Sequence, residues 1–318
     1  MTQWWMWLVF SAIILILLWV DLKFVGGGKS HKVSIKEAGI WTLVWVSVAL
    51  LFNLGLWFWF NHHGGAELAH HKSVEFLTGY ILEKALAVDN VFVWLMLFSY
   101  FAIPPELQRR VLLYGVLGAI ALRTVMIFSG SYLINQFHWI LYIFGAFLLF
   151  SGLKMLFDKE DEAPDLNNNK VLNWVKSHIR ITDELHGERF FVVKNGLKYA
   201  TPLLLALVVV EISDVIFAVD SIPAIFAVTT DPFIVLTSNI FAIMGLRAMY
   251  FLLAGVADRF VLLKYGLAAI LAFIGIKMLV MEFYKIPTLV ALGVIASILV
   301  ITMTASWYVS RKAPSQIN

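Results

Sequence analysis

Long apolar runs follow one another along the whole chain. Each is about 20 residues long, a length that suits a helix crossing a lipid bilayer. Hydrophobic residues make up 61% of the sequence and charged residues only 14%, whereas a soluble domain carries about 25% charged residues. The sequence therefore predicts an all-α polytopic membrane protein with nine transmembrane helices. Their ranges are 4–22, 39–60, 75–99, 111–134, 138–157, 199–228, 233–256, 261–282 and 288–309.

Lysine and arginine alternate between poor and rich connections, which predicts the orientation of the helices. The segment before the first run has none, the connection 23–38 has four and the connection 158–198 has seven. This pattern places the N-terminus outside and the C-terminus in the cytoplasm. The first run lacks a basic start and exceeds the roughly 7–15 apolar residues of a secretory signal, so we expect it to be retained.

Two short windows inside the apolar runs repeat each other. The window Glu83-Lys84-Ala85-Leu86-Ala87-Val88-Asp89-Asn90 matches Asp214-Val215-Ile216-Phe217-Ala218-Val219-Asp220-Ser221. Each begins with an acid and ends with Ala-Val-Asp followed by a small amide or hydroxyl residue. Charged side chains in a membrane-spanning segment are costly, so their presence there suggests function.

The similarity between the two windows continues downstream. Leu122-Arg123 corresponds to Leu246-Arg247, and the segment 152–156 corresponds to 275–279. The sequence therefore predicts two three-helix repeats, 75–157 and 199–284, and the odd number of spans inverts the second. Inverted repeats are typical of secondary transporters, whose sites lie near the membrane midplane. The other predicted parts are two N-terminal helices in 1–74, a cytoplasmic loop in 158–198, and a C-terminal helix with its tail in 285–318.

Carboxylates dominate the polar residues at this depth. Together with amide and hydroxyl neighbours they predict an all-oxygen site for a divalent cation such as Mg²⁺, Ca²⁺ or Mn²⁺. The alternative is that Glu83, Asp89, Glu211, Asp214 and Asp220 form structural ion pairs with Lys84, Arg123 and Arg247. If all five acids are ionised, two negative charges then remain in excess. The predicted metal ligands are Glu83, Asp89, Asn90, Glu211, Asp214, Asp220 and Ser221.

The spacing of the acids limits how they share a site. Glu83 and Asp89 are six residues apart, as are Asp214 and Asp220, so each pair points about 240° apart on an ideal helix. Either one acid of each pair faces the site, or the helix unwinds between them. Pro223 removes a helical hydrogen bond and favours a broken helix in 199–228.

Two connections carry weaker signals. His62, His63, His70 and His71 lie in the connection between the second and third runs, where they suit metal capture or pH sensing. An ordinary solvated loop is the favoured interpretation. The long loop contains a basic amphipathic stretch, 170–181, suited to a membrane surface, although a plain linker is the simpler expectation.

The acidic windows resemble those of the TerC family of integral membrane proteins. The resemblance rests on 83–90 and on Glu211-Ile212-Ser213-Asp214 through 217–224, and it extends from the first run to the ninth. Length and layout are most similar to the Alx branch. The resemblance implies an inner-membrane protein of metal-ion homeostasis with a LysE-like fold, and manganese export as its role. The family's acidic positions carry over to Glu83, Asp89, Glu211, Asp214 and Asp220. Tellurite resistance, which the family name records, fits a carboxylate-lined site poorly and is expected to be secondary.

Composition and the residues around the two aspartates exclude or weaken several other classes of function. The chain has no cysteine, which excludes disulfides, thiolate ligands and thiol catalysis, and a net charge of +3 gives no support for nucleic-acid binding. Two apposed aspartates also suit an intramembrane protease, but the Gly-x-Gly-Asp context is missing. An assembly partner of other membrane proteins without transport of its own stays open, as does a homo-oligomer. The leading hypothesis is a Mn²⁺ exporter working by alternating access, with no enzymatic activity and no resident cofactor.

Overall fold

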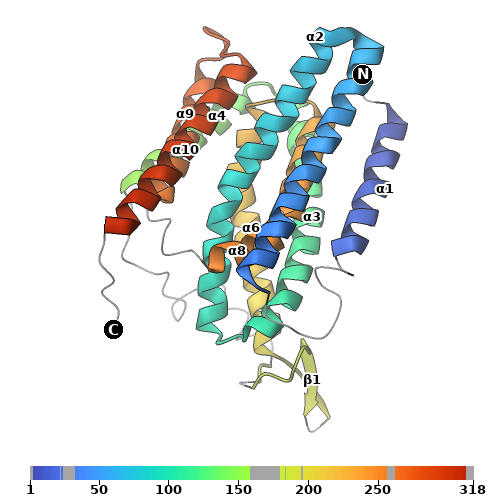
Figure 1. Cartoon of the computed structure of the whole chain (residues 1–318), viewed down its shortest axis with the longest axis vertical. Helices are drawn as coiled ribbons and strands as arrows, with labels where there is room; N and C mark the ends of the chain where they lie inside the picture. Colours follow the sequence, from blue (N-terminus) through green and yellow to red (C-terminus); the bar gives the residue numbers. More distant parts are fainter. Residues whose placement is uncertain are drawn as a thin grey trace.

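The protein is an α-helical bundle with one small β-hairpin, shown by a computed structural model (Figure 1). The structure describes residues 3–21, 23, 33–157, 180–182, 184–194, 196–255 and 262–312. Each of the nine predicted runs falls on a helix, so the all-α membrane architecture is confirmed. The elements are α1 (Trp4–Val20), α2 (Ile35–Tyr100), α3 (Pro105–Gln136), α4 (Ile140–Phe157), β1 (Phe191–Lys194), β2 (Leu197–Ala200), α6 (Pro202–Phe226), α7 (Pro232–Met244), α8 (Leu246–Ala254), α9 (Leu263–Leu279) and α10 (Thr288–Lys312).

Length and hydropathy single out the clearest membrane-crossing helices. Within the described residues, α2, α3, α4, α6 and α10 are long and apolar enough to cross a bilayer, and α7 with α8 forms a sixth span bent by 41°. Helices α1 and α10 lie on opposite sides of the bundle (Figure 1).

Helix α2 contains two of the predicted spans and turns back on itself at a kink. Gly65 has a φ of 85° and a ψ of 168°, outside the helical region, and glycine adopts such a conformation without a steric penalty. The four histidines therefore lie on helical segments on both sides of the kink. The prediction of a loop between the second and third runs was wrong for most of its length, because the chain needs only one non-helical residue to reverse.

The predicted break in α6 was also wrong. The helix is continuous from Pro202 to Phe226, and Pro223 lies in its last turn, so little helix follows it to be deflected. The bend occurs instead in the next span, at Gly245 between α7 and α8. Lys84 of α2 fills the space beside Gly245, and its Nζ donates to the carbonyl oxygen of Ala242 at 3.0 Å.

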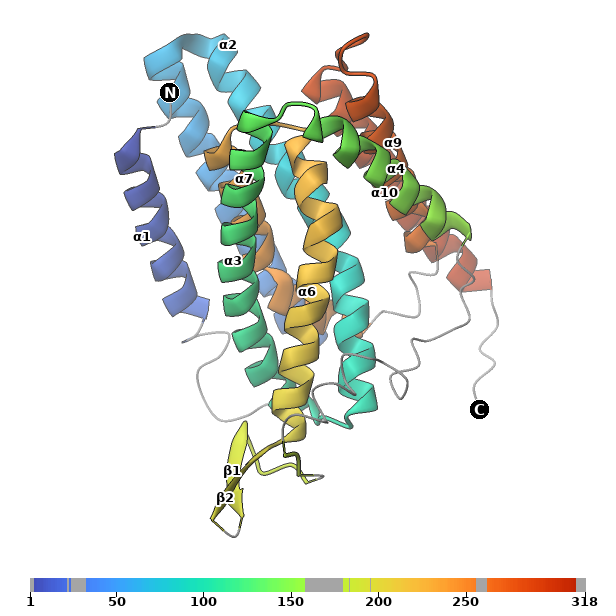
Figure 2. The same ribbon diagram turned by 180° about the vertical axis from the view of Figure 1, so that it is seen from behind.

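Two groups of helices make up the bundle. Helix α2 packs against α6, α7 and α8, and α3 packs against α6 and α7, whereas α4 and α9 pack together along one flank (Figure 2). Helix α10 contacts both α9 and α2. Glycines allow the close approach of α4 to α9: a Cβ at Gly152 would lie 2.7 Å from the carbonyl oxygen of Ala268, and one at Gly275 would lie 2.7 Å from that of Gly145. The inverted relation between the two repeats stays a prediction.

The long connection after α4 is partly structured. Residues 158–179, which include most of the predicted amphipathic stretch, lie outside the described residues. Beyond them, β1 and β2 form an antiparallel hairpin that projects from the end of the bundle where α6 begins (Figure 2). The simple linker expected from the sequence thus contains a hairpin that leads into α6.

Candidate functional site

Four helices bring the two acidic windows together in the core. The first cluster surrounds the side chain of Arg123 on α3. Its Nη1 donates to a carboxylate oxygen of Glu83 on α2 and lies 3.2 Å from both Ser221 Oγ on α6 and Asn239 Oδ1 on α7. Asn239 Nδ2 donates to the second carboxylate oxygen of Glu83 at 3.1 Å. All four side chains are buried, so the Glu83 charge is compensated within the membrane.

A second cluster lies between α2 and α6. Asn90 Nδ2 donates to Asp214 Oδ1 at 3.1 Å, and Glu211 lies one helical turn before Asp214. Three buried oxygens here have no hydrogen-bond partner in the described part of the chain: Asn90 Oδ1, Asp214 Oδ2 and Glu211 Oε2. Buried polar atoms are normally satisfied, so such a group calls for an explanation.

Glycine on α3 makes room for the Glu211 carboxylate. A Cβ at Gly118 would overlap the carboxylate oxygens of Glu211, which lies at the contact between α3 and α6. Arg123, on the same helix, is near enough to Asp214 for their charges to interact. The second cluster is therefore influenced by a cation without any hydrogen bond to it among the described residues.

A cavity connects the two clusters to a third carboxylate. Its volume is about 210 Å³, and it lies between the α2–α3–α6 group and the α4–α9 pair. Asp220 lines it and accepts a hydrogen bond from Ser151 of α4 at 3.1 Å. The other polar groups in its wall are Asn90, Arg123, Ser151, Lys154 and Ser221.

The predicted ligands thus lie in three different places instead of in one site. Glu83 and Ser221 belong to the first cluster, Asn90, Glu211 and Asp214 to the second, and Asp220 to the cavity wall. Asp214 and Asp220 face different neighbours from one continuous helix, which is the first of the two alternatives raised by their spacing. Among the described residues no group of three or more His, Cys, Asp or Glu has a metal-binding arrangement. The side chain of Asp89 lies outside the described part, so its contribution stays a prediction.

Sequence reasoning missed several supporting residues. Ser151 and Gly118 lie outside the repeated windows, and a polar or small residue inside an apolar run was the only signal available. Arg247, the counterpart of Arg123, forms a buried ion pair with Asp21 just beyond the end of α1. Asp21 had been overlooked because it lies at the very end of the first predicted run, 4–22, and outside the repeated windows.

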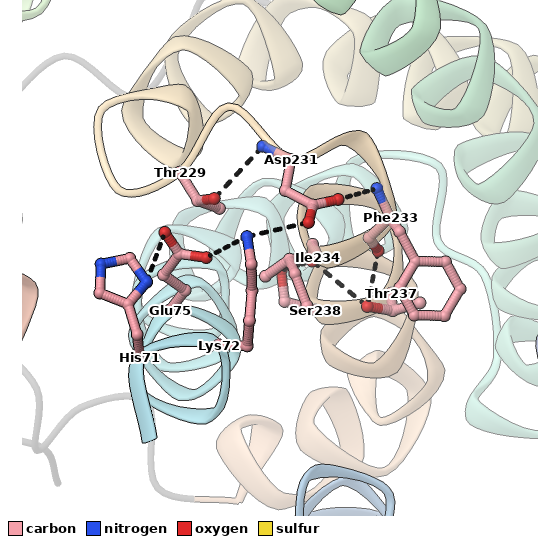
Figure 3. A network of polar contacts seen from close by, with 9 residues as sticks. All are labelled: His71, Lys72, Glu75, Thr229, Asp231, Phe233, Ile234, Thr237 and Ser238. Atoms are coloured by element: carbon pink, nitrogen blue, oxygen red, sulfur yellow. Dashed lines mark hydrogen bonds and ion pairs between the residues drawn. The ribbon is translucent and has the colours of Figure 1, made fainter. Parts of the chain in front are cut away.

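A separate polar network lies at the end of the bundle that contains the kink of α2 (Figure 3). Lys72 Nζ lies 3.0 Å from Glu75 Oε2 and 2.9 Å from Asp231 Oδ2, joining α2 to the start of α7. Asp231 also caps α7 by accepting from the backbone N–H of Phe233, and His71 lies 3.4 Å from Glu75. We call His71, Lys72, Glu75 and Asp231 the kink-end cluster.

Comparison with known proteins agrees with this architecture. The model of the "Integral membrane protein TerC family" matches residues 68–314, a range that contains both clusters and the cavity. The chain belongs to the TerC family.

Several relatives resemble this TerC-family chain over nearly their whole length. It is 63% identical over 306 residues to a protein of Photorhabdus laumondii named "Putative membrane-bound redox modulator Alx", covering 96% of this chain and 95% of that protein. An Escherichia coli protein of the same name is 60% identical over 311 residues, covering 98% and 97%. An uncharacterized membrane protein of Myxococcus xanthus is 47% identical over 310 residues, covering 98% and 94%. No solved structure matches the chain.

Proposed function

We propose that this protein exports a divalent metal cation, most favourably Mn²⁺, across the inner membrane by alternating access. The observation that carries the proposal is the second cluster, where Asn90, Glu211 and Asp214 present buried oxygens that lack partners in the described chain. A charged side chain at the centre of a membrane helix costs about 2.5–3.5 kcal/mol on insertion scales. A bound cation would offset that cost, and carboxylate and amide oxygens suit Mn²⁺.

The cavity reaches the second cluster at Asn90. Its volume accommodates several water molecules at about 30 Å³ each, so a partly hydrated cation fits inside it. Asp220 and Asn90 lie in its wall. In this proposal the N-terminus lies outside and the C-terminus in the cytoplasm, so the long loop and its hairpin face the compartment from which the cation leaves.

The relatives' name suggests redox modulation, and the sequence limits how such a role would operate here. The chain has no cysteine, so thiol–disulfide exchange on its own side chains is excluded. Export of a redox-active cation such as Mn²⁺ offers a route by which a protein without thiols would affect the redox state of the cell.

Flux measurements on purified protein test the proposal. The parent protein in proteoliposomes should move Mn²⁺, whereas Asp214→Asn and Asp220→Asn should reduce flux to the level of protein-free vesicles. Glu188→Gln removes a carboxylate from an exposed ion pair with Arg110 and should transport at the parent rate. Monodisperse gel-filtration profiles for all variants would show that they are folded.

Two outcomes would overturn the proposal. One is Mn²⁺ flux at the parent rate in Asp214→Asn and Asp220→Asn. The other is a parent protein that moves no divalent cation but co-purifies with a stoichiometric membrane partner, which would favour the assembly role instead.

A further inference from the structure

The first cluster surrounds one nitrogen atom with oxygens. We propose that the guanidinium of Arg123 is a tethered cation that occupies a second cation-binding site, formed by Glu83, Ser221 and Asn239. The inference rests on the proposed function only in the choice of Mn²⁺ as the probe.

Hydrogen-bond geometry is the first argument. Nη1 of Arg123 carries two hydrogens, yet it lies within hydrogen-bonding distance of three oxygens from three helices. Nε of the same side chain is buried without a partner among the described residues. An arginine matched to a carboxylate normally uses two nitrogens in a planar fork. Here the oxygens converge on a single point, as ligands converge on a metal ion.

The sequence correspondence gives the second argument. At an offset of 131 residues, Glu83 corresponds to Asp214 and Asn90 corresponds to Ser221. The pair Glu83–Ser221, joined by Arg123, is therefore the counterpart of the pair Asp214–Asn90, which has unpartnered oxygens. One pair holds a cation supplied by the protein, and its counterpart has no hydrogen-bonded cation within the part of the chain that the structure describes.

Ligand chemistry and charge complete the argument. A carboxylate, an amide oxygen and a hydroxyl form a hard-oxygen set that binds Mn²⁺ or Mg²⁺ once the guanidinium is removed. In the parent protein, the guanidinium of Arg123 already binds the oxygens of Glu83, Ser221 and Asn239. These oxygens are therefore not available to a second mobile cation, so the parent protein should bind one cation per chain.

The test is the stoichiometry of Mn²⁺ binding to purified protein, measured by equilibrium dialysis. The parent should bind one ion per chain, Arg123→Ala should bind two, and Arg123→Ala combined with Glu83→Gln should return to one. Arg110→Ala removes an arginine from an exposed pair and should bind as the parent does. Guanidinium ion should displace one of the two ions from Arg123→Ala and none from the parent.

The outcomes separate this inference from the proposed function. A parent protein that binds no Mn²⁺ counts against the proposed function, and one ion in Arg123→Ala would then still support the tethered cation. Equal stoichiometry in the parent and in folded Arg123→Ala overturns the inference. If Arg123→Ala folds only when Mn²⁺ or guanidinium is supplied, the inference is supported; failure of both cations to restore the folded protein overturns it.

Discussion

The two polar clusters in the core are built from corresponding residues but differ in charge balance. In the first, Glu83 is paired with Arg123 and bonded by Asn239. In the second, Asp214 has one hydrogen bond from Asn90, and its other oxygen is unpartnered in the described chain. The same sequence pattern thus gives one site whose carboxylate is bonded to an arginine and one whose carboxylate is bonded only to an amide among the described residues. In our proposal the first cluster stabilises the fold and the second cluster binds the cation.

Neighbouring helices explain this difference. Helix α7 contributes Asn239 to the first cluster, whereas its counterpart on α3, at an offset of 124, is Gly115. Helix α3 contributes Arg123 to the first cluster, whereas the corresponding Arg247 is held by Asp21 beyond the end of α1. Helix α1 lies outside the two predicted repeats and has no counterpart in them. Its Asp21 binds Arg247, the arginine that the sequence correspondence would place near the second cluster.

Removal of the arginine from the first cluster should have the largest effect. Without divalent cations, Arg123→Met leaves Glu83 buried and unpaired, which should lower the free energy of unfolding by about 3–5 kcal/mol. Unfolding by SDS titration in bicelles measures it. Adding Glu83→Gln should recover most of the loss, since Asn239 can still bond the amide. If Arg123→Met alone unfolded with the same free energy as the parent, Arg123 would not compensate the Glu83 charge, and the two clusters would not differ in charge balance.

Removal of the acid from the second cluster should act in the opposite direction. Asp214→Asn keeps the shape and an acceptor for Asn90 but removes a buried charge with an unpartnered oxygen and no directly bonded cation among the described residues, so it should raise the free energy of unfolding by about 1–2 kcal/mol. The same titration should show this gain in the variant that loses Mn²⁺ flux. Destabilisation by Asp214→Asn in the absence of metal would show that the second cluster is charge-compensated after all.

A change at Gly118 should sharpen the assignment of Glu211 to the second cluster. In Gly118→Ala the new Cβ displaces the Glu211 carboxylate, so the affinity for Mn²⁺ should fall about tenfold, equivalent to about 1.4 kcal/mol. Gly55→Ala is the matched control, because a Cβ there meets no described atom within 4 Å. Calorimetric titration should find unchanged affinity in the control, and equal affinities in both variants would remove Glu211 from the site.

Disruption of the kink-end cluster should have the smallest effect. Lys72 is 18% exposed, so its pairs with Glu75 and Asp231 are partly screened by solvent. Lys72→Met should lower the free energy of unfolding by about 0.2–1 kcal/mol, and the loss should shrink at high salt. The Arg123→Met loss should not respond to salt, because that pair is buried. If the loss caused by Lys72→Met did not depend on salt, the Lys72 pairs would be as well shielded from solvent as the Arg123–Glu83 pair.

Local pattern accounts for much of what was predicted correctly. Hydropathy placed the apolar runs on helices, because each run buries its backbone groups internally and must match the bilayer thickness. Helix irregularities were harder to predict. Pro223 was expected to break α6 but is tolerated in its last turn, while Gly245, an unremarked glycine, lies at the bend of the next span. Whether a residue bends a helix depends on which neighbours can satisfy the freed backbone groups, as Lys84 does for Ala242.

The sequence by itself determined the membrane class, the helical segments, the correspondence of the two acidic windows and the acids that interrupt the apolar runs. These follow from composition and spacing along one chain. Only the tertiary structure decided that Arg123 neutralises Glu83, that Arg247 turns to Asp21, and that Gly118 opens space for Glu211. Pairing between helices depends on side-chain rotation and helix contacts, which no spacing within a single segment specifies.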